Sequence, residues 1–161
     1  MNSTALRHRL LASRLADPAT IHGCSPSELD QIEVVAQRPL PRSYADFMTN
    51  FEKGAGRFLR DVEIFYPQVL ALKPVANEIL QDYEDLHLSL PPSAFVFAVR
   101  NKEQFMCFSD ITVDPPVHFY MSGDPAISKV AETFWEFIEC ELEQCERSYQ
   151  QVKDTPYDLR P

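Results

Sequence analysis

Glycine is scarce in this sequence, and its scarcity excludes several ligand-binding motifs. Only four glycines occur among 161 residues, namely Gly23, Gly54, Gly56 and Gly123. Neither the GxGxxG turn of dinucleotide-binding proteins nor the GxxxxGK[ST] phosphate-binding loop can be formed from them. We therefore expect no nucleotide and no other cofactor.

Paired cysteines are also lacking. Cys24, Cys107, Cys140 and Cys145 form no CxxC motif, and His22 with Cys24 is the only close pair of histidine and cysteine. No local nucleophile signature surrounds any of these cysteines. We expect free thiols in a reduced, cytoplasmic protein, with no bound metal and no catalytic residue.

Positively charged residues are fewer than negatively charged ones. The sequence has 15 lysines and arginines against 24 aspartates and glutamates, which gives a net charge of -9. Because binding to a phosphate backbone requires the opposite sign, nucleic acid is not an expected partner. The same charge would speed the encounter with a basic protein.

Long hydrophobic runs are absent as well. The longest, Ala94 to Val99, has the length of a strand and not the ~20 residues that cross a bilayer, so we expect no membrane span. The acid-free start, with leucines among three arginines, is compatible with an organellar transit segment or with an amphipathic first helix. We expect the helix, over residues 1–20.

Apolar periodicity and turn signals predict the remaining elements. Ser25 and Glu28 flank Pro26 as a capping box, which predicts a helix from Pro26 to Ala36. The other expected elements are a helix from Pro41 to Lys53, a strand over 62–66, a helix over 72–88, strands over 94–100, 104–109 and 117–121, and a long helix from Ser128 to Val152 with Val130 on its inner face.

This order predicts an α+β fold, with a single domain in which an antiparallel sheet of about four or more strands is flanked by helices. We expect Phe97 and Phe134 in the core. Residues 101–103, between two strands, predict a hairpin whose turn type is open because it contains no glycine.

Several segments in this order also resemble a known family. They are Leu40-Pro41 before Tyr44-Ala45-Asp46-Phe47, Gly54-Ala55-Gly56, Phe95-Val96-Phe97-Ala98, Phe105 to Asp110, Pro116 to Tyr120, and Thr133 to Ile138. Together they resemble the SUKH superfamily, which includes the Smi/Knr-type regulators of cell-wall assembly. The resemblance covers roughly residues 21–146, and we place the domain at 21–152 with a tail over 153–161.

The resemblance implies an α+β domain without a general catalytic motif. In bacteria it implies an immunity protein that neutralises a toxin, often a nuclease, of a contact-dependent or polymorphic toxin system. In eukaryotes it implies a regulatory scaffold. The first role is our expectation for this chain, the scaffold is the alternative, and an enzyme comes third.

Acidic residues near the ends of predicted elements are the candidate contacts for a basic toxin domain. They are Glu84 and Asp85 near the end of the helix predicted over 72–88 and Asp110 and Asp114 after a strand, with Trp135 as an apolar anchor. Three plainer interpretations are open as alternatives: the aspartates bind their own loops, Trp135 borders the core, and the acidic side of the last helix is only a solvated face.

Overall fold

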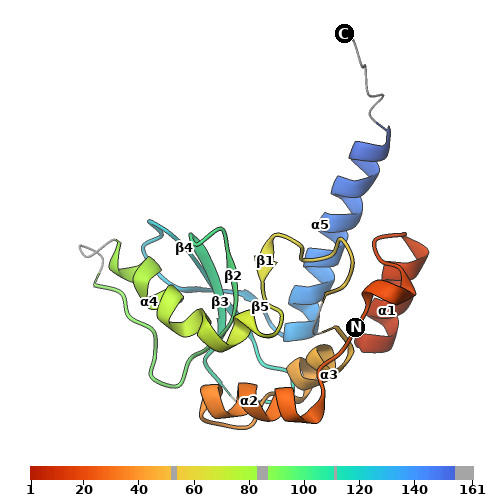
Figure 1. Ribbon diagram of the computed structural model, residues 1–161. Coiled ribbons are helices and arrows are strands. Elements are labelled where there is room, and N and C mark those ends of the chain that lie inside the picture. Colours follow the sequence, from red (N-terminus) through yellow and green to blue (C-terminus); the bar gives the residue numbers. More distant parts are fainter. Residues whose placement is uncertain (52–53, 83–86, 111, 155–161) are drawn as a thin grey trace.

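The computed structural model describes residues 1–51, 54–82, 87–110 and 112–154, with the side chains of 152–154 left aside. Its helices are α1 (Ser3–Ala12), α2 (Pro26–Ala36), α3 (Arg42–Phe51), α4 (Leu72–Gln81) and α5 (Phe134–Asp154). Its strands are β1 (Val62–Glu63), β2 (Phe95–Arg100), β3 (Gln104–Phe108), β4 (Val117–Met121) and β5 (Ser128–Ala131), and single 3₁₀ turns cover Pro18–Thr20 and Gln68–Ala71. The predicted α+β class is confirmed (Figure 1).

The five strands form one antiparallel sheet in the order β1-β2-β3-β4-β5. The predicted hairpin joins β2 to β3, with Arg100 opposite Gln104. Asn101 and Lys102 have φ angles of 55° and 56°, and the Glu103 amide donates to the Arg100 carbonyl at 3.1 Å. Two consecutive positive φ values define a type I′ turn, formed here without glycine.

Helices cover both faces of the sheet. Cys107 and Phe108 are neighbours on β3 and therefore point to opposite faces. The charge of Lys73 on α4 acts on the Cys107 thiol, so Cys107 lies on the side of α4. The ring of Phe108 lies 5.7 Å from the rings of both Tyr44 on α3 and Phe134 on α5. Thus α4 packs on one face and α3 with α5 on the other, which explains why β2 is buried along nearly its whole length.

An aromatic cluster fills the layer beneath α3 and α5. Tyr44 lies at its centre, with ring centroids 5.5 to 5.9 Å from those of Phe95, Phe97, Phe108 and Phe134. Most of these contacts are edge-to-face or tilted, which aromatic rings prefer. Phe97 and Phe134 are fully buried, as predicted.

The two helices α2 and α3 form where the capping and periodicity signals of the sequence predict them. Ser25 and Glu28 form the predicted capping box of α2, and α3 buries Tyr44, Phe47 and Met48 at helical spacing. Gly54 follows α3 with a φ of 127°, while Lys53, the predicted last residue of this helix, lies outside the described residues.

The first helix packs against this body. Leu6 and Leu10 are fully buried, and the hydroxyl of Ser3 donates to a carboxylate oxygen of Asp46 on α3 at 2.9 Å. In Figure 1, α1 also lies beside α5. The domain boundaries placed after residues 20 and 152 remain predictions.

The predicted start of the last helix is wrong. Residues 128–131 form the edge strand β5, in which Ser128 pairs with Phe119 and Ala131 with Val117. The helix begins at Phe134, and Val130 is 49% exposed instead of lying on an inner helical face. Pairing with β4 supplies the backbone hydrogen bonds that a first helical turn would otherwise have made.

Three other predicted elements are shorter than expected. The first helix, predicted over residues 1–20, ends at Ala12. The strand predicted over 62–66 is limited to Val62 and Glu63, which pair with Arg100 and Val99. The helix predicted over 72–88 ends at Gln81; residues 83–86 lie outside the described part, and Leu88 is not helical. None of the described helices has the length and apolar character needed to cross a membrane.

Candidate protein-binding surface

The loop between β3 and β4 holds two of the predicted contact residues. Asp110 is exposed at the end of β3, close enough to Arg38 for its charge to act on that guanidinium. Burial lowers the pKa of Arg38, and Asp110 partly offsets this effect. Arg38 also donates to the Phe108 carbonyl at 3.4 Å. Asp110 thus faces a cation of its own chain while remaining open to solvent.

Asp114 has a structural partner. Its Oδ1 accepts a hydrogen bond from the backbone amide of Trp135 at 3.3 Å, one of the amides that the first turn of α5 leaves without a helical acceptor. The Thr133 hydroxyl accepts from the Glu136 amide at 3.1 Å. Asp114 and Thr133 therefore cap the N-terminus of α5 together.

Trp135 lies next to Asp114 but offers little surface. The residue is 7% exposed, and its ring packs against those of Phe134 at 5.7 Å and Phe47 at 6.4 Å. The structure thus brings Asp114 and Trp135 together, and Asp110 lies in the same loop as Asp114. Glu84 and Asp85 lie outside the described residues, so their predicted role stays a prediction.

The acidic side of α5 is partly neutralised by an arginine of α1. The Arg9 guanidinium lies 3.3 Å from Glu139 Oε1 and 2.6 Å from Glu146 Oε2. The hydrogen bond that Arg9 donates to Glu146 is the largest cause of the raised pKa of Arg9, and burial works against it. These contacts hold the N-terminal helix against α5.

Arg100 forms a second ion-pair network beneath α5. Its Nε lies 3.1 Å from Asp61 Oδ2, and its terminal nitrogen donates to Glu141 Oε2 at 2.6 Å. The side chains of Arg100 and Glu141 are 19% and 12% exposed, so this pair is largely shielded from solvent. It connects the end of β2 to the middle of α5.

A groove of about 290 Å³ opens beside this network, between α5 and the face of β3, β4 and β5. Apolar side chains from the sheet and the helix form most of its wall, and polar ones lie at the end near Arg100. The lining residues are Arg100, Gln104, Met106, Phe119, Val130, Phe137, Cys140, Glu141 and Gln144. We call this surface the α5 groove.

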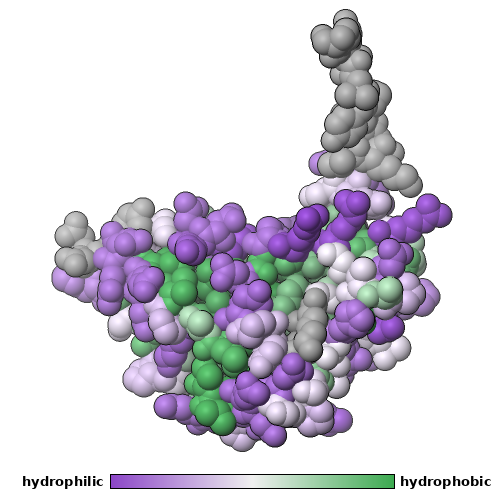
Figure 2. Space-filling model, viewed as in Figure 1, coloured by the Kyte–Doolittle hydropathy of each residue, from purple (hydrophilic) through white to green (hydrophobic). Residues whose placement is uncertain are grey.

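A second apolar area lies at the C-terminal end of α2. Val34 and Val35 are 76% and 43% exposed there, and Figure 2 shows hydrophobic surface over this end of the helix. A pocket of about 270 Å³ lies between this end, α4 and the start of β2.

Three of the four cysteines are not activated as nucleophiles. Burial raises the pKa of Cys107 to about 12, and burial followed by the charges of nearby carboxylates raises the pKa values of Cys140 and Cys145. These three thiols are therefore protonated at neutral pH, the opposite of what a reactive cysteine needs.

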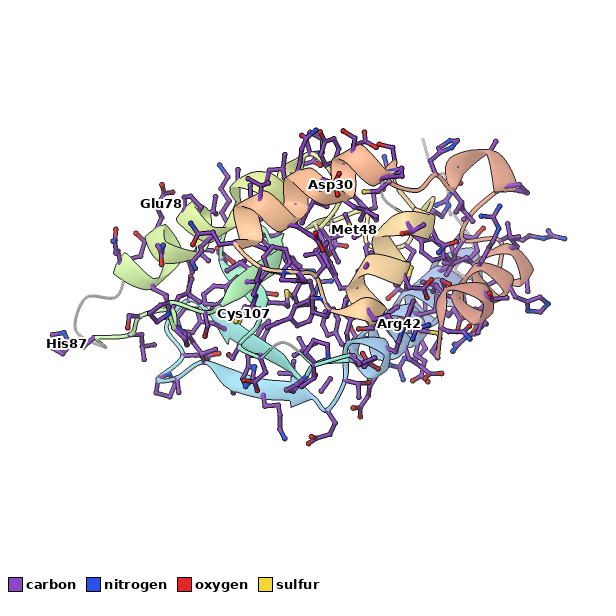
Figure 3. The ribbon with its side chains drawn as sticks, turned by 90° about the horizontal axis from the view of Figure 1, so that it is seen from below. Asp30, Arg42, Met48, Glu78, His87 and Cys107 are labelled. Carbon is purple, nitrogen blue, oxygen red and sulfur yellow. The ribbon has the colours of Figure 1, made fainter. Side chains whose placement is uncertain are left out.

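One histidine lies beside a thiol, because His118 on β4 is the cross-strand partner of Cys107 on β3, whereas the other three histidines are exposed. Figure 3 shows His87 at the outer edge of the molecule and Cys107 within the sheet. His22 is exposed and Cys24 buried, so the close pair in the sequence does not form a common surface. No group of three histidine, cysteine or carboxylate side chains suited to a metal occurs within the described ranges. The Nδ1 of His118 is buried and lacks the hydrogen bond expected there.

The sequence interpretation missed the α5 groove, although signals for parts of it were present. Val130, which lines the groove, is an apolar residue among polar neighbours and is 49% exposed, and Met121 on the adjacent strand is 43% exposed although it does not line the groove. Recognising the groove required knowing that β5 is a strand, because its wall combines residues of four strands with one helix.

Comparison with known families gives one match. The family model of the SMI1/KNR4 family (SUKH-1) matches residues 23–140, which include every strand and helices α2, α3 and α4 in full. No curated protein matches the chain.

Proposed function

Because the chain belongs to the SMI1/KNR4 family (SUKH-1), we propose that it is a non-catalytic immunity protein that binds and neutralises a cognate bacterial toxin. The family match is compatible with this role and also with that of a Smi1/Knr4-type regulator. The observation that favours a basic toxin domain as the partner is the excess of acidic groups, with a net charge of -9.

The arrangement of cations supports this interpretation. Arg9, Arg100 and Lys129 each face carboxylates of their own chain at 2.6 to 3.3 Å, so they contribute little positive potential at the surface. The negative charge that remains would attract a basic domain over the ~8 Å range of charge interactions at physiological salt.

The proposed mechanism is stoichiometric. One molecule would bind one toxin domain and cover its active site or the approach of its substrate, and carboxylates would replace the substrate's phosphates where that toxin is a nuclease. Asp110, which is exposed, would be a contact, as would Glu84 and Asp85. Carboxylates at the rim would mainly raise the association rate, and those buried in the interface would mainly lower the dissociation rate.

The test is surface binding kinetics with the toxin domain encoded next to the gene of this chain, at low and at high salt. We compare the native protein with Glu84→Gln/Asp85→Asn and with Asp110→Asn. The control Asp30→Asn/Glu78→Gln removes two exposed carboxylates from α2 and α4, where Figure 3 shows both side chains pointing outward.

We expect the two test variants to associate about 3- to 10-fold more slowly at low salt, with a smaller difference at high salt and little change in the control. One equivalent of native protein should also abolish the activity of the toxin. An association rate that is indifferent to salt and to the substitutions would discard the electrostatic mechanism. Failure to bind the neighbouring gene product would favour the regulatory scaffold.

A further inference from the structure

The α5 groove combines an open apolar wall with an acidic border. On the sheet side, Val130 is 49% exposed and Phe119 is half-buried, whereas Met106 beneath them is 1% exposed. On the helix side, Phe137 is 7% exposed and Cys140 is exposed. The groove therefore has a closed apolar floor and an accessible apolar upper wall.

The exposed apolar side chains at the groove are clustered rather than scattered. Among the described residues, five large hydrophobic side chains are exposed: Val34, Val35, Val113, Met121 and Val130. Two of them, Met121 and Val130, belong to this part of the sheet, and Met121 pairs with the groove residue Gln104 across β3 and β4. Contiguous apolar surface of this kind, bordered by polar groups, is typical of interaction sites.

The border is negatively charged. Glu136 and Glu143 lie four residues before and three residues after Cys140 on α5, so all three share one side of the helix. Burial and then these carboxylates, with Glu139 and Glu141, raise the pKa of the Cys140 thiol, which shows that their field reaches the groove.

Nearby cations do not cancel this field. Arg100 is held by Asp61 and Glu141, and Lys129 on β5 lies 2.7 Å from Glu132. The charge of Glu143 also acts on Arg9, but Arg9 forms its ion pairs with Glu139 and Glu146. Within the described part of the chain, Glu143 itself forms no ion pair, and the Glu136 carboxylate accepts only the Glu132 amide, at 2.7 Å. The surplus charge at the groove is negative.

We infer that the α5 groove is a docking site for a segment of the basic partner that carries an arginine or lysine beside an apolar side chain. The apolar side chain would cover Val130 and Phe119, and the cation would lie between Glu136 and Glu143. This inference rests on the proposed function, because the partner is the same basic protein. It adds a second contact surface on this chain, separate from the loop that holds Asp110.

The main test places a positive charge on the groove wall. Val130→Lys would oppose both the apolar contact and the cation, while Val34→Lys makes the same change at an exposed valine of α2, outside the groove. Both side chains are exposed, so both variants should fold, which circular dichroism and thermal unfolding would verify. The probe is the toxin domain encoded beside the gene, bound to the full chain.

We expect Val130→Lys to weaken binding at least about tenfold, as substitution at an interface anchor does, and Val34→Lys to change it less than about twofold. Glu143→Gln should slow association at low salt. In a Cys145→Ser background, bound toxin should slow alkylation of Cys140, whose thiol is exposed in the free protein.

The outcomes separate the two proposals. If the native protein binds the toxin but Val130→Lys binds equally well and Cys140 stays equally reactive, the groove is not the docking site and the proposed function stands. If the two valine variants weaken binding equally, the effect comes from net charge and the groove assignment falls. If the native protein does not bind, the proposed function and the inference both fail.

Discussion

Gly23 shows how one small residue fixes the path of the chain. A Cβ atom built on Gly23 would lie 1.6 Å from the Thr49 carbonyl oxygen and 2.4 Å from its carbonyl carbon. The next residue, Cys24, donates its amide to the Met48 carbonyl at 2.9 Å. The segment before α2 therefore crosses directly over the backbone of α3, at a distance that no other residue type allows.

We predict that Gly23→Ala lowers the free energy of unfolding by about 3 kcal/mol or more, because backbone on both sides must move apart. Urea unfolding measures this change. The matched control is Gly54→Ala: its φ of 127° is strained for alanine, but the nearest atom is 3.9 Å away, so we expect a cost of about 1–2 kcal/mol. Equal losses of unfolding free energy in the two variants would show that the close contact with Thr49 adds no cost of its own.

At the scale of elements, the N-terminus of α5 explains why one boundary was misjudged. The Thr133-Phe134-Trp135-Glu136 segment has the spacing of a capping box, and the Thr133 hydroxyl does accept the Glu136 amide. The apolar periodicity that runs through Val130 extended the predicted helix past this signal. The four residues of the edge strand β5 are too few to show a clear strand pattern in the sequence, because their conformation depends on pairing with β4. The helical periodicity therefore dominated the prediction.

For other elements, local signals in the sequence were sufficient to predict the structure. The Ser25 cap predicted α2, and strands on both sides of Asn101 predicted the β2-β3 hairpin. What could not be predicted is the α5 groove, which requires β3, β4, β5 and α5 to be placed relative to one another. The role of Asp114 was hidden for the same reason, because the amide it binds lies 21 residues away.

We predict that Thr133→Ala and Asp114→Ala each lower the free energy of unfolding by about 1 kcal/mol, since each removes an acceptor for a first-turn amide of α5. Thr133→Ser, which keeps the hydroxyl, should retain most of the stability. Chemical unfolding followed by circular dichroism measures all three. If Asp114→Ala weakens toxin binding without a loss of stability, Asp114 acts as a partner contact and its capping role is minor.

At the scale of the whole molecule, the sheet separates two buried groups that resist ionisation. Tyr44 lies on the side of α3 and α5, and Cys107 lies on the side of α4. Burial raises the pKa of Tyr44 well above its ordinary value of 10.0, and it raises that of Cys107 from 9.0 to about 12. Among the residues that the structure describes, the buried Tyr44 hydroxyl has no hydrogen-bond partner that would stabilise its anion.

These shifts predict a loss of stability at alkaline pH. Between pH 9.0 and about 12 the unfolded chain releases the Cys107 proton while the folded chain retains it, so stability is complete below this window and falls as the pH rises through it. The full effect of this one thiol is on the order of 4 kcal/mol. Tyr44 adds a decline in the same direction, beginning near its ordinary pKa of 10.0.

Urea unfolding at about pH 8 and about pH 10.5 tests this prediction, because the second value lies inside the window of both groups. Exposed lysines and tyrosines also titrate there, so the informative quantity is the difference between variants. Cys107→Ser and Tyr44→Phe should each lose less stability between the two pH values than the native protein. Near neutral pH, Tyr44→Phe should be as stable as the native protein or slightly more so, because it removes an unsatisfied buried hydroxyl. An identical alkaline decline in the native protein and both variants would mean that neither buried group controls it.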